Sequence, residues 1–479
     1  MEDPSLFRMD WEVLAGVLAA IVVLSFFIRS CTNCTASRLN SVVNAHRFLI
    51  QRRIMRGFNR LGLIAITSLS IWLSTSSLAT AQTMRAHFID VGQGAATLVE
   101  FPCAAILIDT GGEANGDFDS TDSLMDYLES FFARRSDLKK TLHSLILTHP
   151  HIDHTRGVKN VLQKYRILNA VTNGQETGSG KSGQKALHMT VANGEASANP
   201  ADNVGFEAVW LKGIPKGKGL TNNVIDPVNC GTVDPKITAL WGSISDNPGW
   251  NASKFGNLNN HSVVIRIDFG KASMLVSGDL EDAAISSLIT HYQNTKLLDV
   301  DVYQVGHHGS HNATTDQFLR ALTPEIAVIS MGPRDRETSW TAWAYGHPRK
   351  VIVDLLHKHV SKMRPSATVH VATAAKTFTP IALTRAIYGT GWDGTVALEA
   401  DINGTWRVIA ASPQPVLLNL NTAPAEELST LPMIGHGRAS AIVRYRNENG
   451  PFNAVDDLRK VQGIGAGTIN AIRNLVRTN

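Results

Sequence analysis

The side chains best suited to chemistry lie in one short segment. Residues 148–154 read Thr-His-Pro-His-Ile-Asp-His, directly after an apolar run, so three imidazoles and a carboxylate share one loop. Neutral imidazole and carboxylate are ligands that zinc and similar divalent ions favour. Three histidines would be poor core residues, because each buried ring needs partners for two nitrogens. The segment therefore predicts a metal site, and a catalytic one keeps a position open for water.

Two later segments carry the same kinds of side chain at the ends of predicted strands. Ser277-Gly278-Asp279 follows one apolar run, and the pair His307-His308 follows another between two glycines. A Gly-Asp turn alone is ordinary turn chemistry. Taken with the first loop, however, these segments predict a site for two divalent ions, Zn or Mn, at the rim of a β sandwich.

The elements that must position these residues alternate between short strands and helices, which predicts layered α and β structure. A helix should begin at Ser120 or Thr121 and continue over residues 124–132, and another should span 315–322. Residues 173–258 are rich in Gly, Asn and Ser with little periodicity, so we interpret them as long surface insertions. The strands are expected at residues 86–91, 97–101, 104–108, 144–147, 262–268, 273–276, 301–305 and 326–330.

With these segments in place, the chain resembles the metallo-β-lactamase superfamily, whose H-x-H-x-D-H motif is matched by residues 149–154. Over about residues 84–400 it is similar to the hydrolase domain of the ComEC/Rec2 competence proteins. That resemblance implies an α+β fold, an αββα sandwich, and a metal-dependent hydrolase. It rests on Phe88 to Gly94, Asp109 to Gly112, Asn259 to Val264, Gly278 to Glu281 and His307 to Ser310.

The resemblance also implies which side chains hold the metals. His261 is a further candidate ligand, for the metal that His149 and His151 would hold. The alternative is that His261 has an ordinary role at the end of a strand. Ala95 occupies the acidic position of the family's usual G-Q-G-D-A segment, so that carboxylate is missing. The implied ligands are His149 and His151 on the first metal, Asp153, His154 and His308 on the second, and Asp279 bridging both.

Other residues would assist the ligands. Asp90 and Asp109 would orient them by hydrogen bonds. His347 lies in a segment that resembles one near the family's active face, although a His before Pro is also a common turn residue. Asp153 or His307 would protonate a leaving group. The site suits hydrolysis, but it does not choose between a phosphodiester, lactam, lactone or thioester.

The C-terminal residues 417–479 supply the clue to the substrate. A pattern of an apolar helix end, a Gly-containing turn and a new helix occurs twice, about thirty residues apart, and such helix starts bind anions. This module resembles the tandem helix-hairpin-helix domain of ComEA-type DNA receptors, which implies sequence-independent DNA binding, with docking to protein as the alternative. Met433 replaces the usual first glycine. The implied DNA-binding residues are Gly435, Gly437, Arg438, Gly463, Gly465, Gly467, Arg473 and Arg477.

The N-terminal residues carry targeting signals. Residues 11–28 are apolar enough for a transmembrane helix within an N-terminal segment 1–54, and residues 55–81 read as a signal peptide or a second membrane segment. Met1 and Met55 are alternative starts. We expect an exported protein, periplasmic or extracellular, that contacts the membrane if the segment is retained. In an oxidising compartment, Cys103 and Cys230 could form a disulfide.

Composition limits the alternatives. The chain has 45 basic and 41 acidic residues, but the whole excess lies before residue 82, so net charge gives no argument for DNA binding. We predict a hydrolase domain over 82–410, a linker at 411–416 and a DNA-binding domain over 417–479. The function expected is a phosphodiesterase or nuclease acting on DNA and related to competence, without a nucleotide cofactor. The alternatives are a hydrolase of a non-nucleic-acid ester and a DNA receptor with a degenerate metal domain.

Overall fold

The computed structural model describes residues 82–115, 118–193, 204–231, 233–409, 418–473 and 475–478. The predicted membrane segment 11–28, the segment 55–81 and the linker 411–416 lie outside these residues. Among the helices that the structure describes, none is long and apolar enough to cross a membrane.

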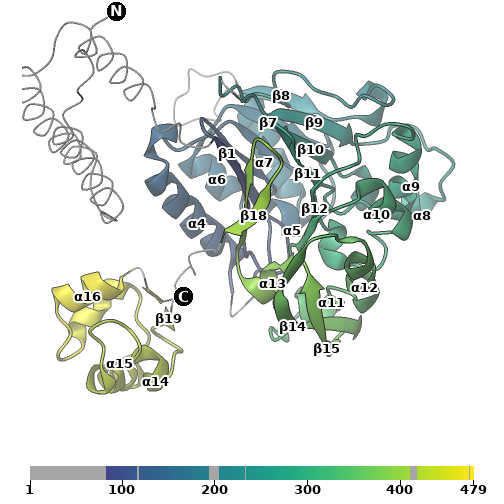
Figure 1. The fold of residues 1–479 in the computed structure, drawn as a ribbon. Coiled ribbons are helices and arrows are strands. Elements are labelled where there is room, and N and C mark those ends of the chain that lie inside the picture. Colours follow the sequence, from purple (N-terminus) through teal and green to yellow (C-terminus); the bar gives the residue numbers. More distant parts are fainter. Residues whose placement is uncertain are drawn as a thin grey trace, which may run out of the picture. The chain divides into compact units, whose positions relative to one another are not determined.

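The first sheet has eight strands in the order β18-β17-β1-β2-β3-β5-β7-β8 (Figure 1). Strands β1, β2 and β3 pair antiparallel, whereas β3, β5, β7 and β8 run parallel. The bounds are β1 Thr83–Phe88, β2 Thr97–Glu100, β3 Ala105–Ile108, β5 Ser144–Ile146, β7 Asn169–Thr172, β8 Gly205–Ala208, β17 Val396–Asp401 and β18 Trp406–Ile409.

The second sheet has six strands in the order β16-β13-β12-β11-β10-β9. Strands β9, β10 and β11 pair antiparallel, and β11, β12, β13 and β16 run parallel. The bounds are β9 Lys236–Trp241, β10 Val264–Phe269, β11 Ala272–Val276, β12 Val302–Gln304, β13 Ile326–Ile329 and β16 Ile387–Gly389.

The two sheets pack face to face, and helices cover both outer faces. Side chains alternate along a strand, so Val99 of β2 joins the core between the sheets while Leu98 packs under the helices of the first sheet. This order of layers confirms the expected αββα sandwich. The covering helices are α4 Ser120–Arg134, α6 Val158–Lys164 and α7 Lys181–Ala192 on the first sheet, and α9 Asp282–His291, α10 Asp316–Leu322 and α12 Lys350–His359 on the second.

Shorter elements complete the domain. Strands β14 Met363–Ala374 and β15 Thr377–Arg385 form a hairpin, and β4 Thr141–Leu142 pairs with β6 Arg166–Ile167. Cys103 and Cys230, whose Cα atoms are 5.4 Å apart, form a disulfide, as the sequence suggested. The short helices are α5 Ile152–Thr155, α8 Ala252–Phe255, α11 Ala342–Tyr345 and α13 Thr390–Asp393.

The interpretation of residues 173–258 as surface insertions was wrong in part. This region contains α7, β8 and β9, and the two strands form the outer edges of the two sheets. Leu240 and Trp241 of β9 are buried in the core between the sheets. Turn-forming residues dominate the composition of this region. The two strands could not be predicted from it, because strand formation depends on pairing with neighbours in the sheet.

The C-terminal residues form a separate small core. Leu428, Ile434, Ile442, Ile464 and Ile469 are buried together, and they come from both copies of the repeat. The elements are β19 Leu418–Asn419, α14 Ala425–Leu428, α15 His436–Asn449, α16 Ala466–Ile472 and β20 Val476–Arg477.

Candidate metal centre

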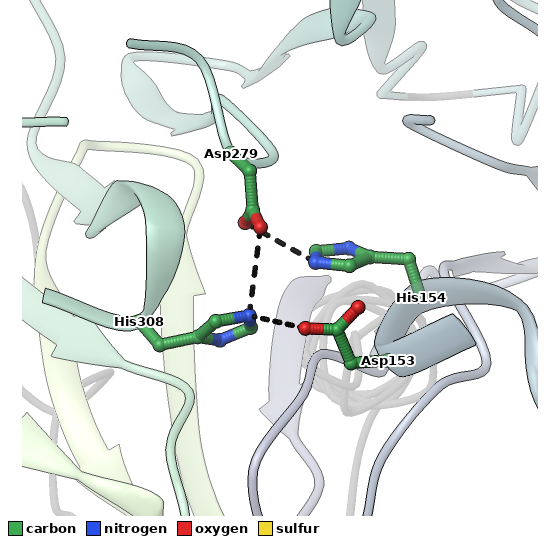
Figure 2. Close-up of side chains that lie close together, drawn as sticks. All are labelled: Asp153, His154, Asp279 and His308. Carbon is green, nitrogen blue, oxygen red and sulfur yellow. Dashed lines mark ion pairs between the residues drawn. The ribbon is translucent and has the colours of Figure 1, made fainter. Parts of the chain in front are cut away.

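The predicted ligands converge at the rim where three strands end. The short helix α5, which follows β5, supplies Asp153 and His154, the turn after β11 supplies Asp279, and the turn after β12 supplies His308 (Figure 2). Strands β11 and β12 run parallel, so their carboxyl ends deliver Asp279 and His308 to the same edge. Residues more than 120 positions apart in the sequence therefore meet in one cluster.

The first group of ligand atoms surrounds Asp279. His154 Nε2 lies 3.1 Å from Asp279 Oδ1, and His308 Nε2 lies 3.7 Å from Asp279 Oδ2. His308 Nε2 also lies 3.3 Å from Asp153 Oδ2. Figure 2 marks this ion pair with a dashed line. Two imidazole nitrogens and two carboxylates thus face one point, which is a donor set suited to zinc or manganese.

A second group shares the same carboxylate. His149 Nε2 and His151 Nδ1 are 3.0 Å apart, and His149 Nε2 is 3.7 Å from Asp279 Oδ2. Two nitrogens bonded at about 2.1 Å to a tetrahedral ion would be about 3.4 Å apart, which is close to this separation. Both groups include Asp279, so its carboxylate lies between them.

Unpartnered buried atoms show that the donor set fits a cation. His154 Nε2, His308 Nε2 and Asp279 Oδ1 are buried and make no hydrogen bond of good geometry among the described residues, although His154 Nε2 and Asp279 Oδ1 lie at the ion-pair distance of 3.1 Å. A buried polar atom without a partner costs roughly 1–3 kcal/mol, so three that face each other need a common ligand. A divalent cation satisfies all three, because it accepts lone pairs from both nitrogens and from the carboxylate.

Asp109 sets the orientation of His154. Its Oδ2 accepts hydrogen bonds from His154 Nδ1 at 2.7 Å and from Thr148 Oγ1 at 2.8 Å, and its Oδ1 accepts one from Thr148 N at 2.8 Å. A proton on His154 Nδ1 leaves the Nε2 lone pair facing the cluster. Asp109 therefore lies where its hydrogen bonds can orient His154.

A backbone carbonyl orients His308 in the same way. His308 Nδ1 donates to the Ser330 carbonyl oxygen at 2.7 Å, which turns Nε2 toward Asp153 and Asp279. His307 and His308 both have left-handed backbone conformations, with φ of 49° and 54°. Such conformations are unfavourable for residues other than glycine and persist where the surroundings impose them. The turn thereby points both imidazoles at the cluster.

Glycines allow neighbouring loops to approach the metal loop. A Cβ on Gly111 would lie 1.9 Å from the Asp153 carbonyl carbon, and one on Gly94 would lie 2.5 Å from the Asp153 oxygen. Ala95 N donates to that oxygen at 3.0 Å. The two Gly-containing motifs found in the sequence therefore support the loop that carries Asp153 and His154.

Burial and charge shift the pKa values of the cluster in opposite directions. Burial opposes ionisation of Asp279, but the facing imidazoles of His154 and His308 hold its pKa well below the usual range. Burial also opposes protonation of His154, yet the charges of Asp279 and Asp109 hold its pKa well above the ordinary value. Burial also opposes ionisation of Asp153, but the facing imidazole of His308, 3.3 Å away, lowers the pKa of this carboxyl. Asp153 is therefore ionised at neutral pH.

Two predicted residues lie away from the cluster. His261 Nδ1 accepts a hydrogen bond from Ile244 N at 3.1 Å, and its Nε2 donates to the Phe255 carbonyl at 2.8 Å. Both nitrogens have backbone partners, so the structure corrects the suggestion that His261 is a ligand. Asp90 Oδ1 accepts from Gly92 N at 3.1 Å and thus shapes its own turn. Burial raises the pKa of Asp90.

His307 and His347 lie beside the cluster. The side chain of His307 is 22% exposed. Its Nε2 lies 3.8 Å from Asp279 Oδ2, and its Nδ1 lies 3.6 Å from Glu281 Oε1. His347 Nδ1 accepts a hydrogen bond from Gln93 Nε2 at 3.0 Å, and its ring centroid is 5.9 Å from that of His307.

Sequence reasoning assigned no role to four groups that the structure brings to the site. Gln93 lies within the motif Phe88 to Gly94 and Glu281 within Gly278 to Glu281, so their positions offered a signal. Thr148 precedes the first ligand directly. The role of the Ser330 carbonyl could not be predicted from the sequence, because every residue has a backbone oxygen.

The C-terminal turns are open at the predicted DNA-binding glycines. A Cβ on Gly435, Gly437, Gly463, Gly465 or Gly467 would meet no atom within 4 Å among the residues described. Met433 and Gly463 occupy matching positions in the two copies, with φ of 62° and 88°. The strained Met433 thus keeps the turn that glycine forms freely.

The predicted arginines of this module have intramolecular partners where the structure describes them. Arg438 donates to the Gly463 and Met433 carbonyls at 2.8 and 2.6 Å, which ties the two turns together. Arg473 pairs with Asp456 at 2.7 Å. The side chain of Arg477 lies outside the described residues.

Two family models match the chain. A metallo-beta-lactamase superfamily model matches residues 89–183, and a helix-hairpin-helix motif model matches residues 414–477. The chain joins a metallo-beta-lactamase domain to a helix-hairpin-helix motif. The first match covers the loop that carries His149 to His154, and the second covers both Gly-containing turns.

The homologues of this chain include competence proteins. Recombination protein 2 of Haemophilus influenzae is 27% identical over 60% of this chain and 28% of its own length. ComE operon protein 3 of Bacillus subtilis is 29% identical over 57% of this chain and 30% of its own length. ComE operon protein 1 of the same organism is 42% identical over 12% of this chain and 29% of its own length. The chain thus spans less than a third of each of these curated relatives.

The chain also has similarity to solved structures. The metallo-beta-lactamase fold protein YhfI from Bacillus subtilis aligns with 52% of this chain and 85% of its own, at 11% identity and a TM-score of 0.29.

Proposed function

We propose that this chain is an exported, metal-dependent phosphodiesterase that hydrolyses DNA held by its helix-hairpin-helix module, in a process related to DNA uptake. The observation that carries the proposal is the set of unpartnered, buried ligand atoms of His154, His308 and Asp279 facing one another. His149 and His151 would hold one of two divalent ions, and Asp153, His154 and His308 the other, with Asp279 between them. When bound, such ions activate water and offset the charge of a phosphodiester.

The protein's own residues prepare this chemistry. Asp109 and the Ser330 carbonyl hold protons on the Nδ1 atoms of His154 and His308, so both Nε2 lone pairs face the cluster. Asp153 is ionised and therefore suited to ligation rather than proton donation. His307, which is partly exposed beside Asp279, remains the group placed to protonate a leaving oxygen.

DNA as the substrate is supported by the C-terminal module. Its open turns allow a phosphate backbone to approach helix starts whose N–H groups bind anions. A module that binds the polymer raises its concentration at a site on the same chain. Export is supported by the signal-like residues 55–81 and by the disulfide, because disulfides persist in oxidising compartments.

Cleavage of supercoiled plasmid by the full chain with Mn²⁺ or Zn²⁺ tests the proposal. We expect cleavage by the unaltered protein and a loss of roughly 100-fold or more in H149A and in D279N, since H149A removes a ligand and D279N removes the negative charge of the carboxylate between the two groups. H261A is the matched control and should cleave normally, because its nitrogens already have backbone partners. Full cleavage by H149A and D279N would refute the assignment. DNA binding without cleavage under any metal would favour a receptor instead.

A further inference from the structure

A row of aromatic rings leads from the metal cluster to the surface. The ring centroids of His308 and His347 are 6.3 Å apart, and those of His347 and Tyr345 are 5.7 Å apart, with the latter planes stacked at 19°. Tyr345 in turn lies 6.2 Å from Trp340 at an angle of 66°. Only two rings therefore separate a candidate metal ligand from Trp340.

The outer end of this row is unusually exposed. Trp340 has 70% of its surface exposed and Tyr345 has 39%, whereas large aromatic side chains usually bury most of their area. Trp340 also has a left-handed backbone, with φ of 65°, which is unfavourable for a bulky residue. An exposed, strained tryptophan beside a candidate active site is better explained by ligand contact than by packing.

The local structure holds this aromatic pair in place. Thr341 Oγ1 donates to the Thr338 carbonyl at 2.8 Å and accepts from Ala344 N at 3.3 Å, which fixes the start of α11 next to Trp340. Tyr345 ends α11 and packs on His347. Burial and the nearby charge of Asp153 raise the pKa of Tyr345 to about 12, so its ring stays neutral beside the cluster.

We propose that Trp340 and Tyr345 form a stacking platform for an unpaired nucleobase of the strand whose phosphate lies at the metal cluster. The proposal rests on the proposed function and adds a preference: single-stranded DNA or an unpaired end over an intact duplex. Bases in a duplex already stack on their neighbours, so an aromatic platform can only receive a base that is free of the stack. Every base has a flat face, so the platform is tolerant of sequence.

Cleavage rates of the full chain on three oligonucleotides test the platform. The substrates are a single strand, the same strand with abasic sites, and a blunt duplex. We expect W340A to lower kcat/KM on the single strand by roughly 5- to 100-fold, the range expected for loss of one base stack, and to leave the abasic strand within about twofold. W340F keeps a ring and should retain most of the activity. F206A is the control, because it removes from the edge strand β8 an aromatic side chain that is as exposed as Tyr345. It should change neither the rate on the single strand nor the rate on the abasic strand.

A second readout does not depend on hydrolysis. A single strand carrying 5-iodouracil, irradiated with the metal-free protein, should cross-link to the peptide that contains Trp340, as located by mass spectrometry. Equal losses on base-bearing and abasic strands in W340A, or cross-links that lie only in residues 418–478, would overturn the platform. If no strand is hydrolysed, the proposed function fails, and the cross-link alone then decides whether the platform binds a base.

Discussion

Replacing Asp109 with Asn tests how the cluster is built, because it removes a charge without removing a ligand. Asp109 is 1% exposed and accepts three hydrogen bonds, from Thr148 N, Thr148 Oγ1 and His154 Nδ1, at 2.7 to 2.8 Å. Asparagine has the same shape and tolerates the left-handed backbone of this position, φ 58°. It offers one acceptor oxygen in place of two.

Neither orientation of the new amide satisfies all three donors. If its NH₂ group faces His154, Nδ1 must accept, and the proton moves to Nε2, the atom that faces the cluster. If its NH₂ group faces Thr148 N, two donors meet in a buried site. Both orientations also remove the negative charge that raises the basicity of His154. We expect metal affinity to fall about 10- to 100-fold, or roughly 1.4–2.7 kcal/mol.

Isothermal titration of Zn²⁺ into the metal-free protein measures this loss. The matched control is D301N, because Asp301 also accepts three hydrogen bonds, from Ser273 N, Ser273 Oγ and Trp406 Nε1, at the opposite end of β11 and β12. All three donors meet the same oxygen of Asp301, Oδ2, so one amide oxygen can accept them, and D301N should leave metal affinity unchanged. If D109N binds Zn²⁺ within twofold of the unaltered protein, the orienting role of Asp109 is wrong.

Three further outcomes are expected. H261A should keep full metal content by mass spectrometry but lose about 1–3 kcal/mol of unfolding free energy in urea, because it orphans two backbone groups; a loss of metal would restore His261 as a ligand. C103S/C230S should have an unfolding free energy about 2–5 kcal/mol lower than that of the oxidised protein, because the disulfide links residues 127 positions apart. Equal unfolding free energies would contradict this. Burial raises the pKa of Asp226 to about 6. Asp226 therefore stabilises the folded state at low pH and loses that contribution as pH rises through 6. Between pH 4 and 7, the unfolding free energy of D226N should rise by about 1–3 kcal/mol relative to that of the unaltered protein. A difference that stays constant with pH would refute this.

The sequence by itself identified features that depend on local chemistry. The candidate ligands at 149–154 could be found because they lie in one short segment, where residue type and spacing already restrict geometry. Helix α10 could be predicted because Thr315 caps it with a side-chain oxygen, as the structure shows. The two helix-hairpin-helix turns could be found because the pattern is repeated. In each case the determining contacts span only a few residues.

The tertiary structure decided which distant groups share the site. Asp90 and Asp109 had equal standing in the sequence, but only Asp109 reaches a ligand, because β3 lies beside β5 and its end faces the metal loop. His261 resembled a ligand until its neighbours supplied backbone partners for both nitrogens. The Ser330 carbonyl orients His308 although any residue has such an oxygen. These outcomes depend on how strands far apart in the chain align, and that alignment comes from packing the whole core rather than from any local pattern.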